Sequence, residues 1–209
     1  MDKQRFNPEE YWDAKHRINY PGLFVPTELA KRSLPYFKRN AVGSLLEIGC
    51  GRSGDSCYFA SKGISVVGLD ISFIALADLS AHIPNHSLLL LIQSDLCNGF
   101  PFRANSFDAV FSRLSLHYFS DQTTKFIFSE IIRILNDNGC IAISVKSEQQ
   151  QDISLQKANL TSNDHPRNLF TVRYAESLLK EYSRVRIREN KIVSGMKMES
   201  PIIEVFAKK

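Results

Sequence analysis

From Ser44 onward, short apolar runs alternate with segments of helical periodicity, and this alternation constrains the fold more than any other feature of the chain. The apolar runs have the length of strands, and the segments between them are long enough to cross back over a sheet. Such a pattern predicts parallel strands joined by right-handed crossovers, with helices on both faces of the sheet. The predicted strands are LLEIG, ISVVGLD, SLLLLIQSD, FDAVFS and CIAISV, and the predicted helices run through CYFASKG, FIALADLSAHI and DQTTKFIFSEIIRIL.

The segments on either side of this alternation are expected to belong to the same domain, residues 1–209. Residues 1–40 have helical periodicity interrupted by Pro21, Pro26 and Pro35, which predicts a helical arm laid on a core of residues 41–209. Asn-Asp-Asn-Gly at 136–139 predicts a turn, and the polar stretch 146–170 predicts a mobile surface loop. Thr171 is expected to cap a short helix, and segments 184–193 and 201–209 are expected to pair as antiparallel strands.

Composition excludes several classes of protein. With 44% hydrophobic and 23% charged residues, the chain has the composition of a folded globular domain. The charged N-terminus has no signal-peptide core, and the longest apolar run, 88–92, is too short to span a bilayer, so we expect a soluble cytoplasmic protein without membrane contact. The four cysteines form no CxxC pair and are expected to be buried and unpaired, and no metal site is expected.

The segment LLEIGCGRSGDS, residues 45–56, joins a buried strand to a helix through a glycine-rich turn. Glycines at such a junction let the backbone approach a ligand closely, and the helix N-terminus favours negative charge. The spacing of Gly49, Gly51 and Gly54 is a weak signal by itself, because it fits dinucleotide binding as well as other ligands.

Three acidic residues at predicted strand ends narrow this choice. Glu47 stands just before the glycine turn, where a carboxylate would repel a pyrophosphate but attract an ammonium and a sulfonium. Asp70 ends the second strand, where it can accept hydrogen bonds from a ribose diol. Asp95 ends the third strand and can accept from an adenine amino group, with Leu96 covering the ring. Together they predict an adenosine site that favours S-adenosylmethionine.

At this point the sequence resembles the class I S-adenosylmethionine-dependent methyltransferases from Ser44 to the C-terminus. LLEIGCG is similar to the first motif of that family, VVGLDIS to its second, and IQSDL with FDAVFSRLSLHYF to later ones. The resemblance implies a Rossmann-like, doubly wound, mostly parallel sheet of seven strands with an antiparallel last strand. GDSCYFASKG and ESLLKEYSRVRIREN are similar to the small-molecule methyltransferases of the tellurite-resistance and thiopurine type. The implied cofactor residues are Trp12, Arg17, Glu47, Gly49, Cys50, Gly51, Asp70, Ile71, Asp95, Leu96 and Arg113.

The sequence departs from the family pattern at one position, because the third glycine is usual at Ser53 and here comes at Gly54. Ser53 is small enough to keep the approach to the loop open. Arg52 is then expected to project outward or toward the methionine carboxylate.

Two further segments are candidates for substrate contact. His117 and Tyr118 follow the fourth strand at the carboxyl edge, so they face the substrate, or else His117 caps the next helix and Tyr118 packs. The resemblance places the arm as a lid, with aromatic rings for stacking and Arg17 for a carboxylate. An amphipathic helix packed on the sheet edge explains most of the same residues, which are Tyr11, Trp12, His16, Arg17 and Tyr20.

The leading hypothesis is therefore methyl transfer to a small-molecule acceptor, with His165, Arg167 and the 146–170 insert shaping the acceptor pocket. A protein lysine methyltransferase and a cofactor-binding module without turnover remain as alternatives, and a nicotinamide-dependent enzyme is disfavoured by Glu47. A net charge of +4 is small for a nucleic-acid binder, and Arg184, Arg186 and Arg188 lack interleaved aromatics, so no nucleic-acid partner is expected. The protein is expected to be a monomer or a homodimer.

Overall fold

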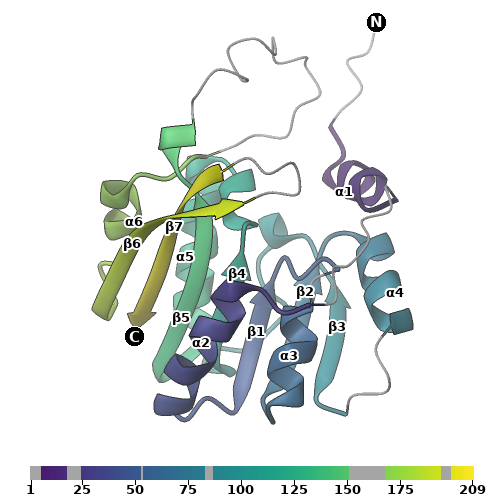
Figure 1. Ribbon diagram of the computed structural model, residues 1–209, viewed down its shortest axis with the longest axis horizontal. Helices are drawn as coiled ribbons and strands as arrows, with labels where there is room; N and C mark the ends of the chain where they lie inside the picture. Colours follow the sequence, from purple (N-terminus) through teal and green to yellow (C-terminus); the bar gives the residue numbers. More distant parts are fainter. Residues whose placement is uncertain (1–5, 18–24, 53, 83–86, 151–167, 194–198) are drawn as a thin grey trace, which may run out of the picture.

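The computed structural model describes residues 6–17, 25–52, 54–82, 87–150, 168–193 and 199–209, and within them the chain forms one seven-stranded sheet (Figure 1). The strand order is β3-β2-β1-β4-β5-β7-β6, and β7 alone runs antiparallel to its two neighbours. The predicted fold class is confirmed. The strands are β1 Ser44–Ile48, β2 Ser65–Asp70, β3 Leu89–Gln93, β4 Phe107–Arg113, β5 Leu135–Lys146, β6 Ser183–Val193 and β7 Glu199–Lys208.

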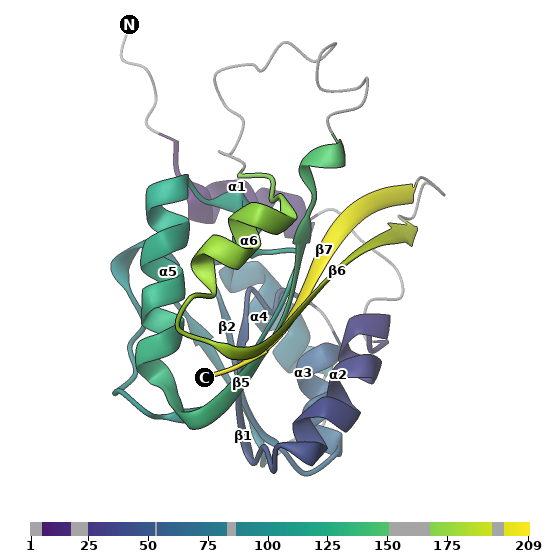
Figure 2. The same cartoon turned by 90° about the vertical axis from the view of Figure 1, so that its left-hand side faces the viewer.

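Helices cover both faces of the sheet (Figure 2). On one face α2 and α3 pack against β1, β2 and β4, and on the other face α5 and α6 pack against β1, β4, β5 and β7. Burial on both faces explains why these strands read in the sequence as continuous apolar runs. The helices are α1 Pro8–Arg17, α2 Glu28–Arg39, α3 Asp55–Ser61, α4 Phe73–His82, α5 Asp121–Ile134 and α6 Val172–Leu178, with short 3₁₀ turns η1 Leu96–Asn98, η2 Leu116–Tyr118 and η3 Glu148–Gln150.

The expected arm of residues 1–40 divides into two parts with different burial. α1 has no buried residue, whereas α2 buries one face against the sheet and is capped by Thr27, whose side chain accepts from the N–H of Ala30. Pro35, which was expected to interrupt the helix, lies at an exposed position inside α2. The buried residues on either side of it, Leu34 and Phe37, hold the helix against the core despite the lost backbone hydrogen bond.

The turn expected at 136–139 is instead a bulge inside β5, which begins already at Leu135. Phe107 pairs with Leu135 and Ala109 with Cys140, so four residues of β5 lie opposite Asp108 alone. Asp108 accepts a hydrogen bond from Asn136 at 2.7 Å, and Asn138 takes a positive φ of 67°. The turn-forming residues are therefore used to kink the strand around a carboxylate.

The C-terminal predictions are confirmed. Thr171 caps α6 by accepting from the N–H of Tyr174, and β6 pairs antiparallel with β7. All four cysteines are free, but burial holds for only two of them, because Cys57 is half-buried and Cys97 is exposed. Among the helices that the structure describes, none is long and apolar enough to cross a membrane.

Candidate functional site

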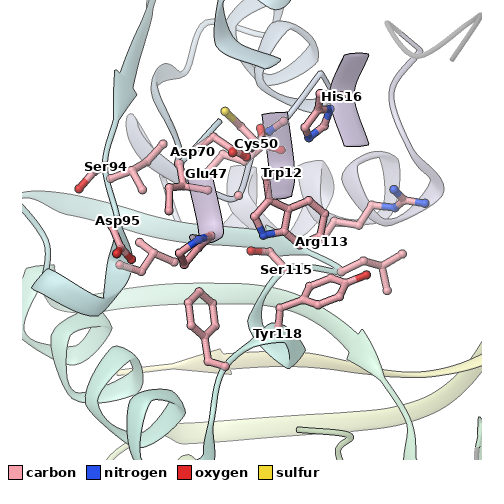
Figure 3. A pocket seen from close by; sticks show the side chains of 18 of the residues that line it. Trp12, His16, Glu47, Cys50, Asp70, Ser94, Asp95, Arg113, Ser115 and Tyr118 are labelled. Carbon is pink, nitrogen blue, oxygen red and sulfur yellow. Dashed lines mark hydrogen bonds between the residues drawn. The ribbon is translucent and has the colours of Figure 1, made fainter. Parts of the chain in front are cut away.

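A cavity of about 530 Å³ lies at the carboxyl ends of β1, β2, β3 and β4 and is covered by α1 (Figure 3). Open parallel sheets bind ligands at this edge, where the loops after neighbouring strands diverge. In the view of Figure 3, Asp95 lies toward one end of the cavity, Tyr118 and Arg113 lie toward the other, and Glu47 and Asp70 lie between them. The cavity therefore spans the ends of several strands and is not confined to one of them.

The glycine turn after β1 forms the floor of the cavity and cannot carry side chains there. Gly49 and Gly51 have positive φ values of 65° and 49°, which disfavour any other residue. A Cβ atom at Gly49 would lie 2.2 Å from the hydroxyl oxygen of Ser115, and one at Gly51 would lie 3.3 Å from the His16 ring. The turn is therefore packed from below by the loop after β4 and from above by α1.

Glu47 is the most deeply buried of the acids that line this cavity, with 1% of its surface exposed. The hydroxyl of Ser56, in the first turn of α3, donates to its carboxylate at 2.5 Å. β1 positions the residue because its alternate side chains are fixed in the two apolar layers around it. A fixed negative charge is thereby held beside the glycine turn.

Asp70 lies at the end of β2 and is tied to the backbone on both sides. It accepts from the N–H of Gly51 at 2.7 Å and from the N–H of Ser72 at 2.9 Å. Burial raises the pKa of Asp70, and these hydrogen bonds and the nearby His16 act against the rise. Burial in turn lowers the pKa of His16, with Asp70 opposing. The carboxylate is thus preorganised against the glycine turn.

Asp95 and Leu96 follow β3 at the far end of the cavity. The Asp95 carboxylate caps η1 by accepting from the N–H of Cys97 at 2.9 Å, and its side chain still lines the cavity. Leu96 is buried and belongs to the core on the α5 face. The pair therefore combines a hydrogen-bond acceptor with an apolar surface, which suits the edge and face of a purine ring.

Two arginines line the cavity and differ in their partners. Arg52 pairs with Asp78 of α4, so it points along the glycine turn toward that helix and not into solvent. Arg113, at the end of β4, forms no ion pair with a carboxylate of the described residues. Burial raises the pKa of Asp55, while hydrogen bonds from Thr27 and the charge of Arg113 act to lower it. Of the two arginines among the described lining residues, Arg113 is therefore the one without an ion-pair partner.

α1 is held over the cavity by polar contacts with the start of α4 and by an aromatic contact with η2. Asp13 accepts from the hydroxyl of Ser72 at 2.6 Å and from the N–H of Ile74 at 3.2 Å. Trp12 meets Tyr118 edge to face, with ring centroids 4.7 Å apart. Because Ser72 also donates to Asp70, one residue links the helix to the acid at the end of β2.

The structure brings most of the predicted residues to one place. Ten of the eleven predicted cofactor residues line the cavity, and so does Tyr118. Arg17 does not, because it lies exposed at the end of α1, where His16 faces the glycine turn instead. The remaining predictions on Ser53, Tyr20, His165 and Arg167 lie outside the described residues.

His117 is also outside the cavity lining, because η2 turns its side chain into the protein. It is fully buried, its carbonyl accepts from the N–H of Asn168 at 2.8 Å, and its ring lies 4.2 Å from that of Tyr118 between centroids. The cap that the sequence allowed it to provide for α5 comes from Ser120, which accepts from Thr123. The histidine therefore supports Tyr118 and does not face a ligand.

Several lining residues carried no signal in the sequence. Leu114 has a positive φ of 53°, which is rare for a residue of this type, and this backbone places Ser115 against Gly49. Val25 and Thr27 reach the cavity from the segment before α2. Only the tertiary contact between the two loops distinguishes Ser115 from any other polar loop residue.

The chain has a Rossmann-like fold with a cavity at the topological switch point between β1 and β4. Residues 46–143 match the family model described as a methyltransferase domain. This part of the chain is therefore similar to a methyltransferase domain.

Named relatives match a part of the chain of similar length. An uncharacterised methyltransferase from Synechocystis is 30% identical over 99 residues, which cover 47% of this chain and 45% of that protein. An 18S rRNA (guanine-N7)-methyltransferase from Schizosaccharomyces pombe is 34% identical over 101 residues, which cover 47% of this chain and 36% of that protein. The chain thus matches less than half the length of these two relatives.

Solved structures share the fold over nearly the whole chain. An S-adenosylmethionine-dependent methyltransferase from Anabaena variabilis superimposes with a TM-score of 0.71 at 16% identity and covers 96% of this chain and 92% of that one. The likeness in fold therefore extends beyond the segment matched by the family model.

Proposed function

We propose that this protein transfers a methyl group from S-adenosylmethionine to a small-molecule acceptor. The observation that carries the proposal is the set of three carboxylates, Glu47, Asp70 and Asp95, which line one cavity from the ends of three neighbouring strands around a glycine turn. A pyrophosphate would meet three negative charges there, whereas a ligand with an adenosine and a cationic end would meet complementary groups.

The residues fit the adenosine half of the cofactor in a definite order. Asp70 accepts from the ribose hydroxyls, Asp95 accepts from the adenine amino group, and Ile71 and Leu96 supply apolar surface for the ring. Gly51 lets the backbone come close to the ribose, because a Cβ atom would fill the gap below His16. These acceptors and apolar surfaces therefore match the hydroxyl groups, the amino group and the ring of a nucleoside without phosphates.

The methionine half lies toward Glu47 and Arg113. The buried carboxylate of Glu47 attracts the ammonium and sulfonium charges, and Arg113 attracts the methionine carboxylate. Gly49 and Cys50 complete this end of the site. When bound, the cofactor supplies an electrophilic methyl group, and the chain's own contribution is to hold an acceptor in line with it.

Trp12 and Tyr118 are the residues we assign to acceptor positioning, because their rings close the cavity between α1 and η2. A cavity of about 530 Å³ under a covering helix leaves room beside the cofactor for a group of modest size. These features support the small-molecule acceptor and the likeness to the tellurite-resistance and thiopurine enzymes. The four free cysteines suit a reducing compartment such as the cytoplasm.

A base of RNA is the second candidate acceptor. The relative from Schizosaccharomyces pombe is named for methylation of 18S rRNA, and the exposed arginines of β6 give this chain a surface of suitable charge. The protein lysine methyltransferase and the binding module without turnover remain as competing outcomes of the test.

The test is the formation of S-adenosylhomocysteine by the purified full chain, followed by mass spectrometry with S-adenosylmethionine and one acceptor class at a time. The classes are thiols, amines, phenols, chalcogen oxyanions, a lysine peptide and single-stranded RNA. The proposal predicts turnover with a small molecule and a large loss in Tyr118→Ala. Cofactor binding without turnover on any class would identify a binding module, and turnover only on the peptide or the RNA would overturn the small-molecule assignment.

A further inference from the structure

A second surface, away from the cavity lining, is formed where α2 meets the outer strands of the sheet. We propose that it binds single-stranded RNA through the phosphate backbone. We call it the arginine surface, and it consists of Arg32, Tyr36, Arg184, Arg186, Arg188 and Phe206. The sequence alone predicted a solvated strand face here, because β6 has no aromatic residues between its arginines. In the folded protein, α2 and β7 place the rings of Tyr36 and Phe206 beside them.

The pairing of β6 with β7 fixes these side chains next to one another. Arg186 lies opposite Phe206 and Arg188 lies opposite Glu204, so each pair occupies one face of the sheet at neighbouring positions. Arg32 of α2 forms an ion pair with the same Glu204. Tyr36, one turn further along α2, meets Phe206 edge to face with centroids 5.4 Å apart. Arg32, Arg186 and Arg188 therefore share one face, and Arg184 lies at the irregularity that precedes Arg186 in β6.

The charge of this surface is not neutralised within the protein. Glu204, the acid beneath it, is 3% exposed and already pairs with Arg32. Across the described residues, no ion pair engages Arg184, Arg186 or Arg188, although all three are exposed. Glu189 alternates to the opposite face, where it accepts from Gln149. An uncompensated positive surface attracts a polyanion.

The chemistry favours RNA over other polyanions. Guanidinium groups present a planar fork of donors that matches phosphate oxygens. Alternate residues of an extended strand lie about 6.7 Å apart, so Arg186 and Arg188 can contact successive phosphates of an extended strand. Tyr36 and Phe206 are partly exposed beside them and offer ring surface to unstacked bases. The extended spacing and the partly exposed rings suit a single strand with unstacked bases, whereas a duplex hides its bases.

The arginine surface is connected to the cavity through α2. Thr27 lines the cavity and caps α2, and Arg32 follows five residues later, about 7.5 Å along the helix axis. A strand bound to the surface therefore passes near the rim of the cavity. This inference deepens the second candidate acceptor, but binding at the surface does not require that the RNA be methylated.

The experiment measures fluorescence anisotropy of a labelled single-stranded RNA of about 20 nucleotides on the full chain between about 50 and 200 mM salt. The test variant is Arg184→Gln/Arg186→Gln/Arg188→Gln. The matched control is Lys62→Gln/Arg103→Gln/Arg173→Gln, which removes the same charge from exposed residues of other elements. We expect the test variant to bind about tenfold or more weakly, with a salt slope reduced by about 2, and the control to bind like the wild type.

Equal losses in the two variants would overturn the proposal, and so would absence of binding by the wild type at the lower salt concentration. Vesicles containing phosphatidylserine form a further arm, and binding to vesicles but not to RNA would assign the surface to a membrane. Calorimetric titration with S-adenosylmethionine accompanies each variant. Intact cofactor binding in the test variant shows that it is folded, and loss of RNA binding then leaves the proposed methyl transfer untouched.

Discussion

At the scale of single residues, the cofactor site depends on acids that end strands and glycines that cannot be replaced. The acids could be predicted from the sequence because a polar residue at the end of a buried run stands out from its neighbours, as Glu47 and Asp70 do. The contacts of Ser115 with Gly49 and of His16 with Gly51 could not, because they join segments that are far apart in the sequence. For His117 the sequence left open whether it faces the substrate or the protein interior, and the structure places it in the interior.

Asp70→Asn is expected to weaken S-adenosylmethionine binding. The variant keeps the size of the side chain but removes the charge that accepts from the ribose hydroxyls, and charge-assisted hydrogen bonds contribute about 1.5 to 3 kcal/mol. Calorimetry should therefore show an affinity about 10 to 100 times lower. Asp137→Asn, on the exposed bulge of β5, is the control and should bind normally. Unchanged affinity of the Asp70 variant would refute its role at the ribose.

Gly49→Ala is expected to abolish cofactor binding, because the new Cβ atom would lie 2.2 Å from the Ser115 hydroxyl oxygen at a positive φ. Adding Ser115→Gly removes the colliding atoms and should restore part of the binding, while the backbone strain remains. Melting temperature and calorimetry of the single and double variants test this. No improvement in the double variant would mean that the contact between the two loops is not what excludes a side chain.

At the scale of elements, the alternation of strands and helices could be predicted, and the local departures could not. The strands of the core stand out because they are buried on both faces. The bulge in β5 reads as a turn because its residues, such as Asn138, are those that turns use. Residues 1–40 read as one arm, although only α2 buries apolar side chains, since both segments have helical periodicity.

α1 is expected to act as a lid held by Asp13. Asp13→Ala removes its hydrogen bonds to Ser72 and Ile74, whereas α4 keeps the Ser72 side chain as its own cap. KM for S-adenosylmethionine should rise about 5- to 20-fold, from the loss of about 1 to 2 kcal/mol of docking energy. The melting temperature should change little, because α1 buries no residue.

The chain contains one tryptophan, Trp12, so its emission reports on the lid directly. The Asp13 variant should show red-shifted emission without cofactor, and Glu10→Ala on the exposed side of the same helix should not. A normal KM together with unchanged emission would show that α1 does not need Asp13 to cover the cavity.

At the scale of the whole molecule, the antiparallel pairing of segments 184–193 and 201–209 could be predicted because they are close in sequence, and the family resemblance implied the seven strands. The order of the strands was not predicted. The hydrogen bonds by which a partly buried acid joins distant segments could not be predicted. Asp108 is the main example: it accepts from the N–H groups of Gly43 and Ser44 and from Asn136, and so it ties the start of β1 to β4 and β5.

Asp108 is expected to set part of the acid sensitivity of folding. Burial would raise the pKa of Asp108, but hydrogen bonds from Asn136, Ser44 and Gly43 outweigh it and lower that pKa below the ordinary 3.8. The stabilisation is therefore present above pH 3.8 and is lost as the pH falls through the lowered pKa. Asp108→Asn should lower the free energy of unfolding at neutral pH by about 1 kcal/mol or more.

Urea denaturation of the wild type and the Asp108 variant at neutral pH and near pH 3 tests this prediction. The difference between them should shrink in acid, and contributions of other carboxyl groups, such as Asp55, cancel because both proteins contain them. A difference that stays constant, or grows, as the pH falls would contradict the assignment.

The central claim is that this cavity binds S-adenosylmethionine through the charge of Glu47, and calorimetric titration with S-adenosylmethionine and with adenosine tests it most directly. The wild type should bind both. Glu47→Gln should weaken binding of the charged cofactor about tenfold or more and leave the affinity for uncharged adenosine nearly unchanged. Equal losses for both ligands, or a wild type that binds neither, would contradict the account.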